Sequence, residues 1–382
     1  MAFSDLIGQA GEKAQLRQMA DGSRIPHALL FLGPSGSGKL ALALAFAQYI
    51  LCDNKAAGDA CGHCSNCLKA SKLIHPDIHF SYPTIGPKAV STQFANQWRE
   101  AVLHNPYMDI NQWLQNIGAE NKQGNITRDE CVDIVRKLSL KAFESSHKIL
   151  IMWLPEFLGK EGNRLLKIIE EPPENTIFIL VAEDQELILN TILSRCQIVS
   201  IKAMSDEEIT AGLAARKGIG QQEAQSIAFL ANGNFNEALS LAEQHENDKA
   251  ELFLNWMRQC YRGNGIQLVQ WAEKMAALGR ENQKHFLRYA LHFLREFVVL
   301  KITGATQVRL QADELDTARK MAAILELSQV EQLAKLFSDC SFAVERNANP
   351  KVLFLDASIQ MHKIMKNKLA EAYTGLPAQN VL

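Results

Sequence analysis

The chain has 382 residues, of which 47% are hydrophobic and 21% are charged, and its formal net charge is −2. This composition is that of a globular protein of two or three domains, and the charge excludes a strong overall attraction to nucleic acid or to an anionic membrane. The sequence has no apolar run long enough for a membrane span and no secretory signal at its start, so we expect a cytoplasmic protein with reduced thiols.

The first predicted elements surround a glycine-rich loop. After one expected helix within residues 4–24, the apolar run 28–32 predicts a buried strand and 41–47 predicts a helix. The loop between them, 33–40, reads GPSGSGKL. A strand, a glycine-rich loop, a lysine and a helix in this order are typical of a phosphate-binding loop. The phosphate-binding residues would be Gly33, Gly36, Gly38 and Lys39. The alternative is a glycine-rich turn that holds no ligand.

One position of this loop departs from the usual pattern. Ser or Thr normally follows the lysine because its hydroxyl is a ligand of Mg²⁺, whereas this chain has Leu40. The loop therefore lacks one part that hydrolysis requires. We expect at most the binding of ATP or ADP without hydrolysis.

The next feature is a cluster of cysteines at 52–67, which contains four of the eight cysteines of the chain. Four thiolates at tetrahedral geometry suit Zn²⁺, whereas disulfides are disfavoured in a reducing compartment. Unrelated free cysteines, the other alternative, would not cluster in this way. The sequence therefore predicts a structural zinc ion, with His63 and His75 as reserve ligands. The four predicted ligands are Cys52, Cys61, Cys64 and Cys67.

The segment 76–125 gives weak signals. Its prolines, glycines and asparagines favour loops around short helices, and Trp98 and Trp113 are expected to pack locally. Beyond it, helices alternate with buried strands, which predicts a parallel sheet covered on both faces. The strands are expected at 148–152, 176–181 and 197–201, and the helices at 127–138, at 162–171 and just before residue 194.

The strand at 148–152 lacks the residues that an ATPase needs at its tip. A phosphate-loop ATPase carries an Asp there that holds Mg²⁺, and often a Glu beside it that activates water. This chain has Trp153 and Leu154 at these positions. Glu156 follows two residues later and is expected to point elsewhere. The ATPase site of this chain is therefore predicted to be inactive.

Strand patterns end after residue 204. Residues 205–243 predict three short amphipathic helices, and the chain from 246 to 382 is helical throughout, with apolar residues at helical spacing. The expected fold class is α/β plus all-α. We see no internal repeat and no low-complexity tract.

Several motifs taken together resemble the bacterial clamp-loader AAA+ subunits of DNA polymerase III. They are RIPHA at 24–28, the cysteine cluster, LLKIIEEPP at 165–173 and SRC at 194–196. The resemblance covers about 3–75 and 126–240 by motif, and the helical tail by pattern only. It implies a RecA-like AAA+ P-loop module at 1–202 with a zinc knuckle at 52–67 and an insertion at 76–125, a helical lid at 203–245, and a helical collar for oligomerisation at 246–382.

Within this family, the chain resembles most the delta-prime type, a non-hydrolysing relative of gamma/tau. Glu237 also stands about where the family carries an arginine that faces the γ-phosphate. The resemblance implies a ring of five subunits, with gamma/tau and delta subunits, that loads the sliding clamp onto primed DNA during replication. Arg195 would be an arginine finger donated to the ATP site of a neighbouring subunit. The alternative for Arg195 is a surface ion pair.

Two other functions are open at this point. One is a catalytically active ATPase of the gamma/tau type that holds its metal unconventionally. The other is a free-standing module that binds zinc and nucleotide and has no role on DNA. Steady ATP turnover by the isolated chain would favour the first, and co-purification with clamp-loader subunits would exclude the second.

Overall fold

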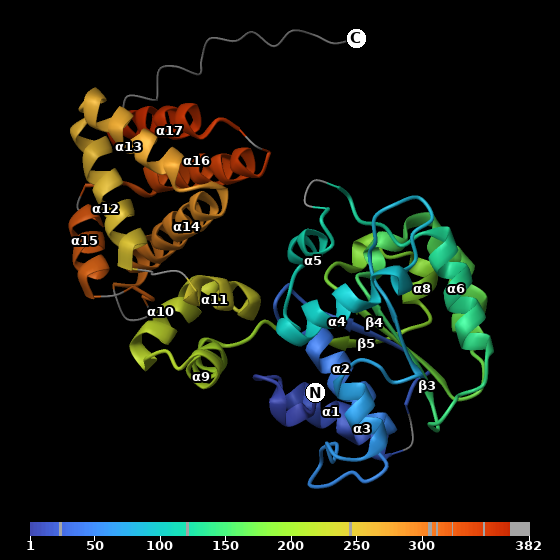
Figure 1. Cartoon of the computed structure of the whole chain (residues 1–382). Helices are drawn as coiled ribbons and strands as arrows, with labels where there is room; N and C mark the ends of the chain where they lie inside the picture. The colour runs from blue at the N-terminus through green and yellow to red at the C-terminus, as the bar shows by residue number, and fades with distance from the viewer. Residues whose placement is uncertain are drawn as a thin grey trace. The chain divides into compact units, whose positions relative to one another are not determined.

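The computed structural model describes residues 1–22, 25–119, 122–243, 247–304, 308–310, 312–322, 324–346 and 348–366. Arg24 of the RIPHA motif and the end of the predicted collar, 367–382, lie outside the described residues. The chain separates into two compact units, Met1–Ser240 and Leu241–Leu382, which are described in turn (Figure 1).

A parallel five-stranded sheet forms the centre of the first unit. Its order is β2-β3-β4-β1-β5, and every pairing is parallel. The predicted parallel sheet is confirmed. It has one further strand, β2, which was not predicted because His79 is polar and prolines lie nearby in the sequence. The strands are β1 (Ala28–Leu32), β2 (Ile78–Ser81), β3 (Lys148–Trp153), β4 (Thr176–Ala182) and β5 (Gln197–Ser200).

Helices cover both faces of the sheet because the side chains of each strand alternate between the two faces. Leu30 and Phe178 pack in a core with α6 and α7 on one face. On the other face Phe31 packs against α2, where its ring lies 6.2 Å from that of Phe46. The α-helices of this unit up to the last strand are α1 (Ala10–Asp21), α2 (Lys39–Leu51), α3 (Ser65–Ser71), α4 (Ala95–His104), α5 (Ile110–Asn116), α6 (Arg128–Ser139), α7 (Leu166–Glu170) and α8 (Asn190–Leu193).

The region predicted as one helix at 162–171 differs from the expectation. A 3-10 stretch, η3 (Pro155–Leu165), comes first, and only α7 is α-helical. Gly159 inside η3 has a left-handed φ of 50°, which interrupts regular helix. The remaining 3-10 turns are η1 (Phe3–Asp5), η2 (Ser91–Phe94) and η4 (Gln185–Leu187).

Three short helices follow the sheet, where the sequence predicted them. They are α9 (Asp206–Lys217), α10 (Gln221–Ala231) and α11 (Phe235–Ala242), and we call them the lid. Ser205 and Glu208 form a capping box at the start of α9.

The segment 76–125 is folded against the edge of the sheet. It contains β2, α4 and α5, and its aromatic side chains form a small core of their own. The Trp98 ring stacks on Tyr82 at 4.0 Å and meets Trp113 edge-on at 5.2 Å. Trp153, the last residue of β3, lies 5.4 Å from Trp98 and joins this core to the central sheet. The predicted local packing of the two tryptophans is confirmed.

Replacing Trp98 with alanine is expected to destabilise the first unit by about 3–5 kcal/mol, because the side chain is 1% exposed and the cavity cannot refill. Differential scanning calorimetry of the full chain would measure the shift in the melting temperature. The control is Phe143→Ala, since Phe143 is 82% exposed and its loss should change stability by no more than about 0.5 kcal/mol. Equal melting temperatures for the two variants would contradict the packing described here.

Within its described residues, the second unit consists of helices and the loops that connect them. Its core contains Trp256 and Trp271, whose rings stack in parallel at 4.5 Å, and Trp256 donates a hydrogen bond to Ser358. No helix within the described ranges has the length and hydropathy of a membrane span. The helices are α12 (Asn247–Arg262), α13 (Gly265–Ala277), α14 (Arg280–Thr303), α15 (Ala312–Ala322), α16 (Leu327–Glu345) and α17 (Pro350–Met365).

Candidate functional site

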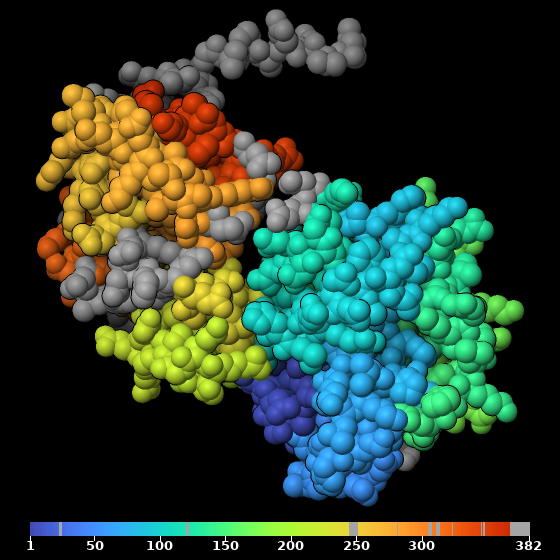
Figure 2. Space-filling view, in the orientation of Figure 1, coloured from blue at the N-terminus to red at the C-terminus, as the bar shows by residue number. Residues whose placement is uncertain are grey.

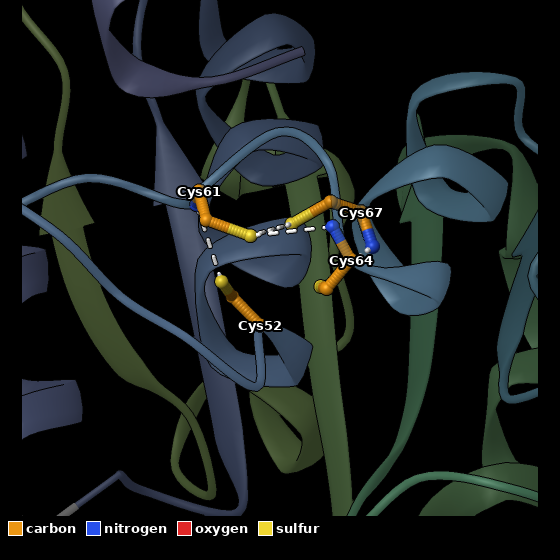
Figure 3. Close-up of side chains that lie close together, drawn as sticks. All are labelled: Cys52, Cys61, Cys64 and Cys67. Carbon is orange, nitrogen blue, oxygen red and sulfur yellow. Dashed lines mark hydrogen bonds between the residues drawn. The ribbon is translucent and has the colours of Figure 1, made fainter.

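The structure brings the four predicted cysteines together between α2 and α3. Cys52 directly follows α2, Cys61 lies in the connecting loop, Cys64 is the N-cap of α3 and Cys67 lies inside α3. The four Sγ atoms lie within 4.8 Å of one another, and Figure 3 shows the four side chains close together. Four sulfurs around one zinc ion would be separated by about 3.8 Å, given Zn–S bonds of about 2.3 Å. The Sγ atoms of Cys61 and Cys67 are 3.9 Å apart, so the cluster could hold a metal ion with little rearrangement.

Backbone groups around this cluster also favour thiolates. The N–H of Cys61 donates to Cys52 Sγ at 3.2 Å, and the N–H of Cys64 donates to Cys61 Sγ at 3.4 Å. The second bond lowers the pKa of Cys61 to about 6. Burial raises the pKa of Cys52 and of Cys67, because the sulfurs lie away from water. A divalent cation would offset that burial and deprotonate the thiols outright.

The two reserve histidines do not belong to the cluster. The ring of His63 is exposed, and its Nδ1 lies 2.8 Å from the carbonyl oxygen of Cys61. His75 is buried, and its Nε2 lies 3.0 Å from Oδ1 of Asn66. Asn66 in turn donates to the carbonyl of Leu51 at 2.9 Å. His75 therefore supports the packing of α3 on the end of α2 and does not approach the sulfurs.

The glycine-rich loop lies between β1 and the N-terminus of α2. Gly36 and Gly38 have left-handed φ values of 68° and 85°, which glycine adopts without strain. The loop and the first turn of α2 thus have the conformation in which backbone N–H groups can surround an anion. Lys39, the first residue of α2, lies beside them. The four predicted phosphate-binding residues therefore belong to one local structure.

The charged end of Lys39 is bonded within the chain. Its Nζ donates to the carbonyl of Pro34 at 2.6 Å and lies 3.6 Å from a carboxylate oxygen of Glu183. Burial lowers the pKa of Lys39, and Glu183 acts against that shift. Glu183 was not among the residues predicted from the sequence, although a signal existed. It follows β4 directly, and the carboxyl ends of neighbouring parallel strands meet at one edge of a sheet.

The three residues that replace catalytic groups are all buried, with exposed fractions of 3–4%. They are Leu40, Trp153 and Leu154. The expectation that Glu156 points elsewhere is wrong. Its carboxylate accepts hydrogen bonds from the backbone N–H groups of Glu183 and Asp184, at 2.5 and 3.0 Å, and its charge reaches Lys39. Two carboxylates thus lie at the edge of the sheet near the lysine.

Arg195 lies on the surface after α8, close to the edge strand β5. Its Nη2 is 3.0 Å from the Glu170 carboxylate at the end of α7, and its Nη1 donates to the carbonyl of Thr191 at 2.7 Å. The Arg195 side chain is 29% exposed and that of Glu170 is 57% exposed. The guanidinium is therefore fixed in direction and still accessible from outside the chain.

The lid meets the glycine-rich loop at the start of α11. Asn234 accepts the N–H of Glu237 at 3.0 Å and so caps the helix, and the N–H of Phe235 donates to the carbonyl of Gly36 at 3.0 Å. Glu237 is in the first turn of α11. Tyr107 also lies against the loop, and no local pattern in the segment 76–125 indicated this.

Comparison with known proteins places the chain in a family. Residues 8–205, more than half of the chain, match the family described as "DNA polymerase III, delta subunit". The chain belongs to this family. The match includes the cysteine cluster, the glycine-rich loop and Arg195. The parallel sheet and the helices that follow it confirm the predicted α/β plus all-α fold class.

Individual relatives carry names from the same polymerase. The chain is 26% identical to DNA polymerase III subunit tau of Bacillus subtilis, over 63% of this chain and 37% of that protein. It is also 26% identical to subunit delta' of the same organism, over 58% of this chain and 56% of that protein. The chain thus spans between about a third and three fifths of these relatives. A solved gamma subunit-related protein of Thermotoga maritima aligns with a TM-score of 0.43 at 14% identity, over 93% of this chain and 99% of that chain.

Proposed function

We propose that this chain is a delta-prime-type subunit of a bacterial DNA polymerase III clamp loader. In this role it is a partner without its own ATP hydrolysis, and it works in a ring of five subunits with gamma/tau and delta. The ring loads the sliding clamp onto primed DNA, and the chain meets DNA through the complex. Membership of the family and the similarity to both delta' and tau subunits support this proposal.

The observation that carries the proposal is the burial of Trp153. An active module needs an acid at the end of β3 that faces the bound metal. Trp153 is instead 3% exposed and packs on Trp98 in the aromatic core of the segment 76–125. A carboxylate at this position would be buried among aromatic rings, which is strongly unfavourable. The fold at this point favours packing over metal binding.

Three further parts of the molecule have roles in the same proposal. The cysteine cluster holds one structural Zn²⁺, and Arg195 is offered to the ATP site of a neighbouring subunit. The helices from α12 onward form the collar that joins the ring.

The second candidate is an active ATPase of the gamma/tau type, which the carboxylates of Glu156 and Glu183 favour. Both lie near Lys39 at the edge where a metal would be needed. For this function one of them would have to leave its present partners and bind Mg²⁺ without the help of a hydroxyl at Leu40.

The isolated chain is expected to show no ATP turnover with Mg²⁺, because ligands are missing at Leu40 and at Trp153 and the water-activating acid is missing at Leu154. A coupled ATPase assay on the purified full chain measures this. Lys39→Ala is the control for contaminating activity and should give the same background. Multiple turnovers that disappear in Lys39→Ala would favour the gamma/tau alternative.

Reconstitution with the gamma/tau and delta subunits of the same organism tests the role in the ring. We expect one stable complex that hydrolyses ATP and loads the clamp onto primed DNA, and we expect loading to fail when this chain is left out. Lys39→Ala in this chain should leave the rate of the complex unchanged. If the chain does not associate with these subunits, the free-standing zinc and nucleotide module becomes the better explanation.

A further inference from the structure

An AAA+ fold suggests a bound nucleotide, which would need open space around the glycine-rich loop. Glycines are required in such loops because a phosphate approaches the backbone closely. In this chain protein atoms already occupy those approaches. A Cβ built at Gly36 would lie 1.7 Å from Oδ1 of Asn234, and one at Gly38 would lie 3.0 Å from the ring of Tyr107. Asn234 and Tyr107 thus pack directly against the loop, on the side where its glycines leave room.

The phosphate end of the site is satisfied by the chain itself. The carbonyl of Gly36 accepts the N–H of Phe235 from the lid. Lys39, which would otherwise reach the outer phosphates, is bonded to Pro34 and paired with Glu183. A nucleotide would have to break these contacts before its own charges could be paired, and Leu40 offers no hydroxyl to hold an accompanying Mg²⁺ ion.

The rest of a nucleotide would have to leave the loop past Gly38, because the side of Gly33 is closed. A Cβ at Gly33 would lie 2.1 Å from the carbonyl oxygen of Ile201. The Tyr107 side chain fills the space past Gly38 and is 3% exposed. Its ring meets that of Phe235 edge-on at 4.9 Å, and its hydroxyl oxygen accepts the backbone N–H of Ile7 at 3.4 Å.

These contacts are the kind that a purine base needs. A base is usually held by an aromatic or apolar side chain on its face and by a backbone group on its edge. Here Phe235 offers the aromatic contact and Ile7 offers the backbone N–H. Tyr107 occupies both of these contacts. The guanidinium of Arg216 lies 5.1 Å from the centre of the Tyr107 ring and closes the site from the lid.

The stretch of chain that carries Tyr107 is held by the sheet on one side and by the lid on the other. Trp98 in α4 anchors the segment on the sheet through Trp153. Just after α4, the amide of Asn105 donates to Asn236 of the lid at 2.6 Å and accepts the N–H of Tyr107 at 3.0 Å. In Figure 2 the surface of the segment, in teal, lies directly against that of the lid, in yellow-green.

We propose that this chain carries an internal substitute for a nucleotide, to which the segment 76–125 contributes Tyr107. The ring of Tyr107 takes the place of the base, and Glu183 with Asn234 takes the place of phosphate groups. The lid is thereby held against the P-loop module without any bound ligand. A role for this segment is thus assigned independently of whether the chain works in a clamp loader.

Titration with a fluorescent ADP analogue, mant-ADP, tests this proposal on the full chain with and without Mg²⁺. The wild type is expected to show no saturable binding up to about 1 mM. Tyr107→Ala combined with Glu183→Ala is expected to bind at least about tenfold more tightly than the wild type. Unlabelled ADP should compete, and adding Lys39→Ala should abolish the gain. Tyr107→Phe keeps the ring in place, so this variant should not bind mant-ADP. Tyr261 is a half-exposed tyrosine of the second unit, and Tyr261→Ala should behave like the wild type.

Two results would overturn the proposal. One is competitive binding of mant-ADP by the wild type that Lys39→Ala removes. The other is a double variant that keeps the circular dichroism spectrum of the wild type and still binds no better. If that variant does not fold, Asn105→Ser is used, since it loosens Tyr107 and leaves the ring in place. Hydrogen exchange should then rise together in residues 105–108 and 233–236, and unchanged exchange in either segment would refute the link between them.

Discussion

Cys64→Ser is expected to reduce the zinc content of the purified protein from about one ion per chain to near zero. A serine hydroxyl is not a ligand that structural zinc sites use, and binding of such an ion contributes about 10–16 kcal/mol to folding. Cys64 is also the N-cap of α3 and accepts the N–H of Cys67. Serine is itself a good N-cap, so the substitution removes a metal ligand and preserves the start of the helix.

Elemental analysis together with thermal unfolding measures this effect. Cys131→Ser is the matched control, since Cys131 is a buried cysteine of α6 outside the cluster. It should retain the metal. Acid should also release zinc from the wild type, because protons compete for the thiolates that hold the ion. Unchanged metal content in Cys64→Ser would show that the cluster does not bind zinc.

Arg195→Ala is expected to slow ATP hydrolysis by the reconstituted complex by up to about 10³-fold, with zinc, folding and ring assembly unchanged. Charge spreads over the γ-phosphoryl oxygens as the bond breaks, and a fixed planar cation stabilises it. In this chain the guanidinium is fixed by Thr191 and Glu170. The pair with Glu170 is exposed and so is worth only about 0–1 kcal/mol, and a phosphate could replace it easily.

Two substitutions separate this role from that of a surface ion pair. Arg195→Lys should restore little of the rate, because lysine offers a flexible point charge in place of a planar fork. Arg164→Ala removes a comparable surface pair, with Glu161 at 2.6 Å, and should leave the rate unchanged. Wild-type hydrolysis and clamp loading by the Arg195→Ala complex would rule out the finger.

The central strands were predictable from the sequence because strands buried on both faces appear as continuous apolar runs. The run 176–181 became β4 at Thr176–Ala182, and 148–152 became β3 at Lys148–Trp153. The strand β2 was missed, since its four residues include His79 and Ser81, which give no such run. Helix starts with a capping residue, as at Thr127, were also predictable.

In the candidate site, too, some residues were predictable from the sequence and others were not. The cysteine cluster was predictable because its four ligands lie within sixteen positions, so spacing alone implies proximity. Tyr107 approaches Gly38, and Glu183 approaches Lys39, through tertiary contacts between segments that are distant in the sequence. Only the position of Glu183 directly after β4 gave a signal in the sequence. Glu156 was misjudged because the turn after β3 depends on a left-handed Leu154, with φ of 56°, that the residue type does not suggest.

The place of β1 in the sheet affects how the protein can be made. β1 pairs only with β4 and β5 among the described strands, so it has no partner until β4, which ends at Ala182, has been synthesised. Ribosomes add about 5–20 residues per second, so the wait is on the order of ten seconds. During this time α2, whose thirteen residues are all buried in the finished fold, has no sheet to cover it. We expect the nascent chain to need a chaperone at this stage, while the cysteine loop beside α2 can already close around its metal.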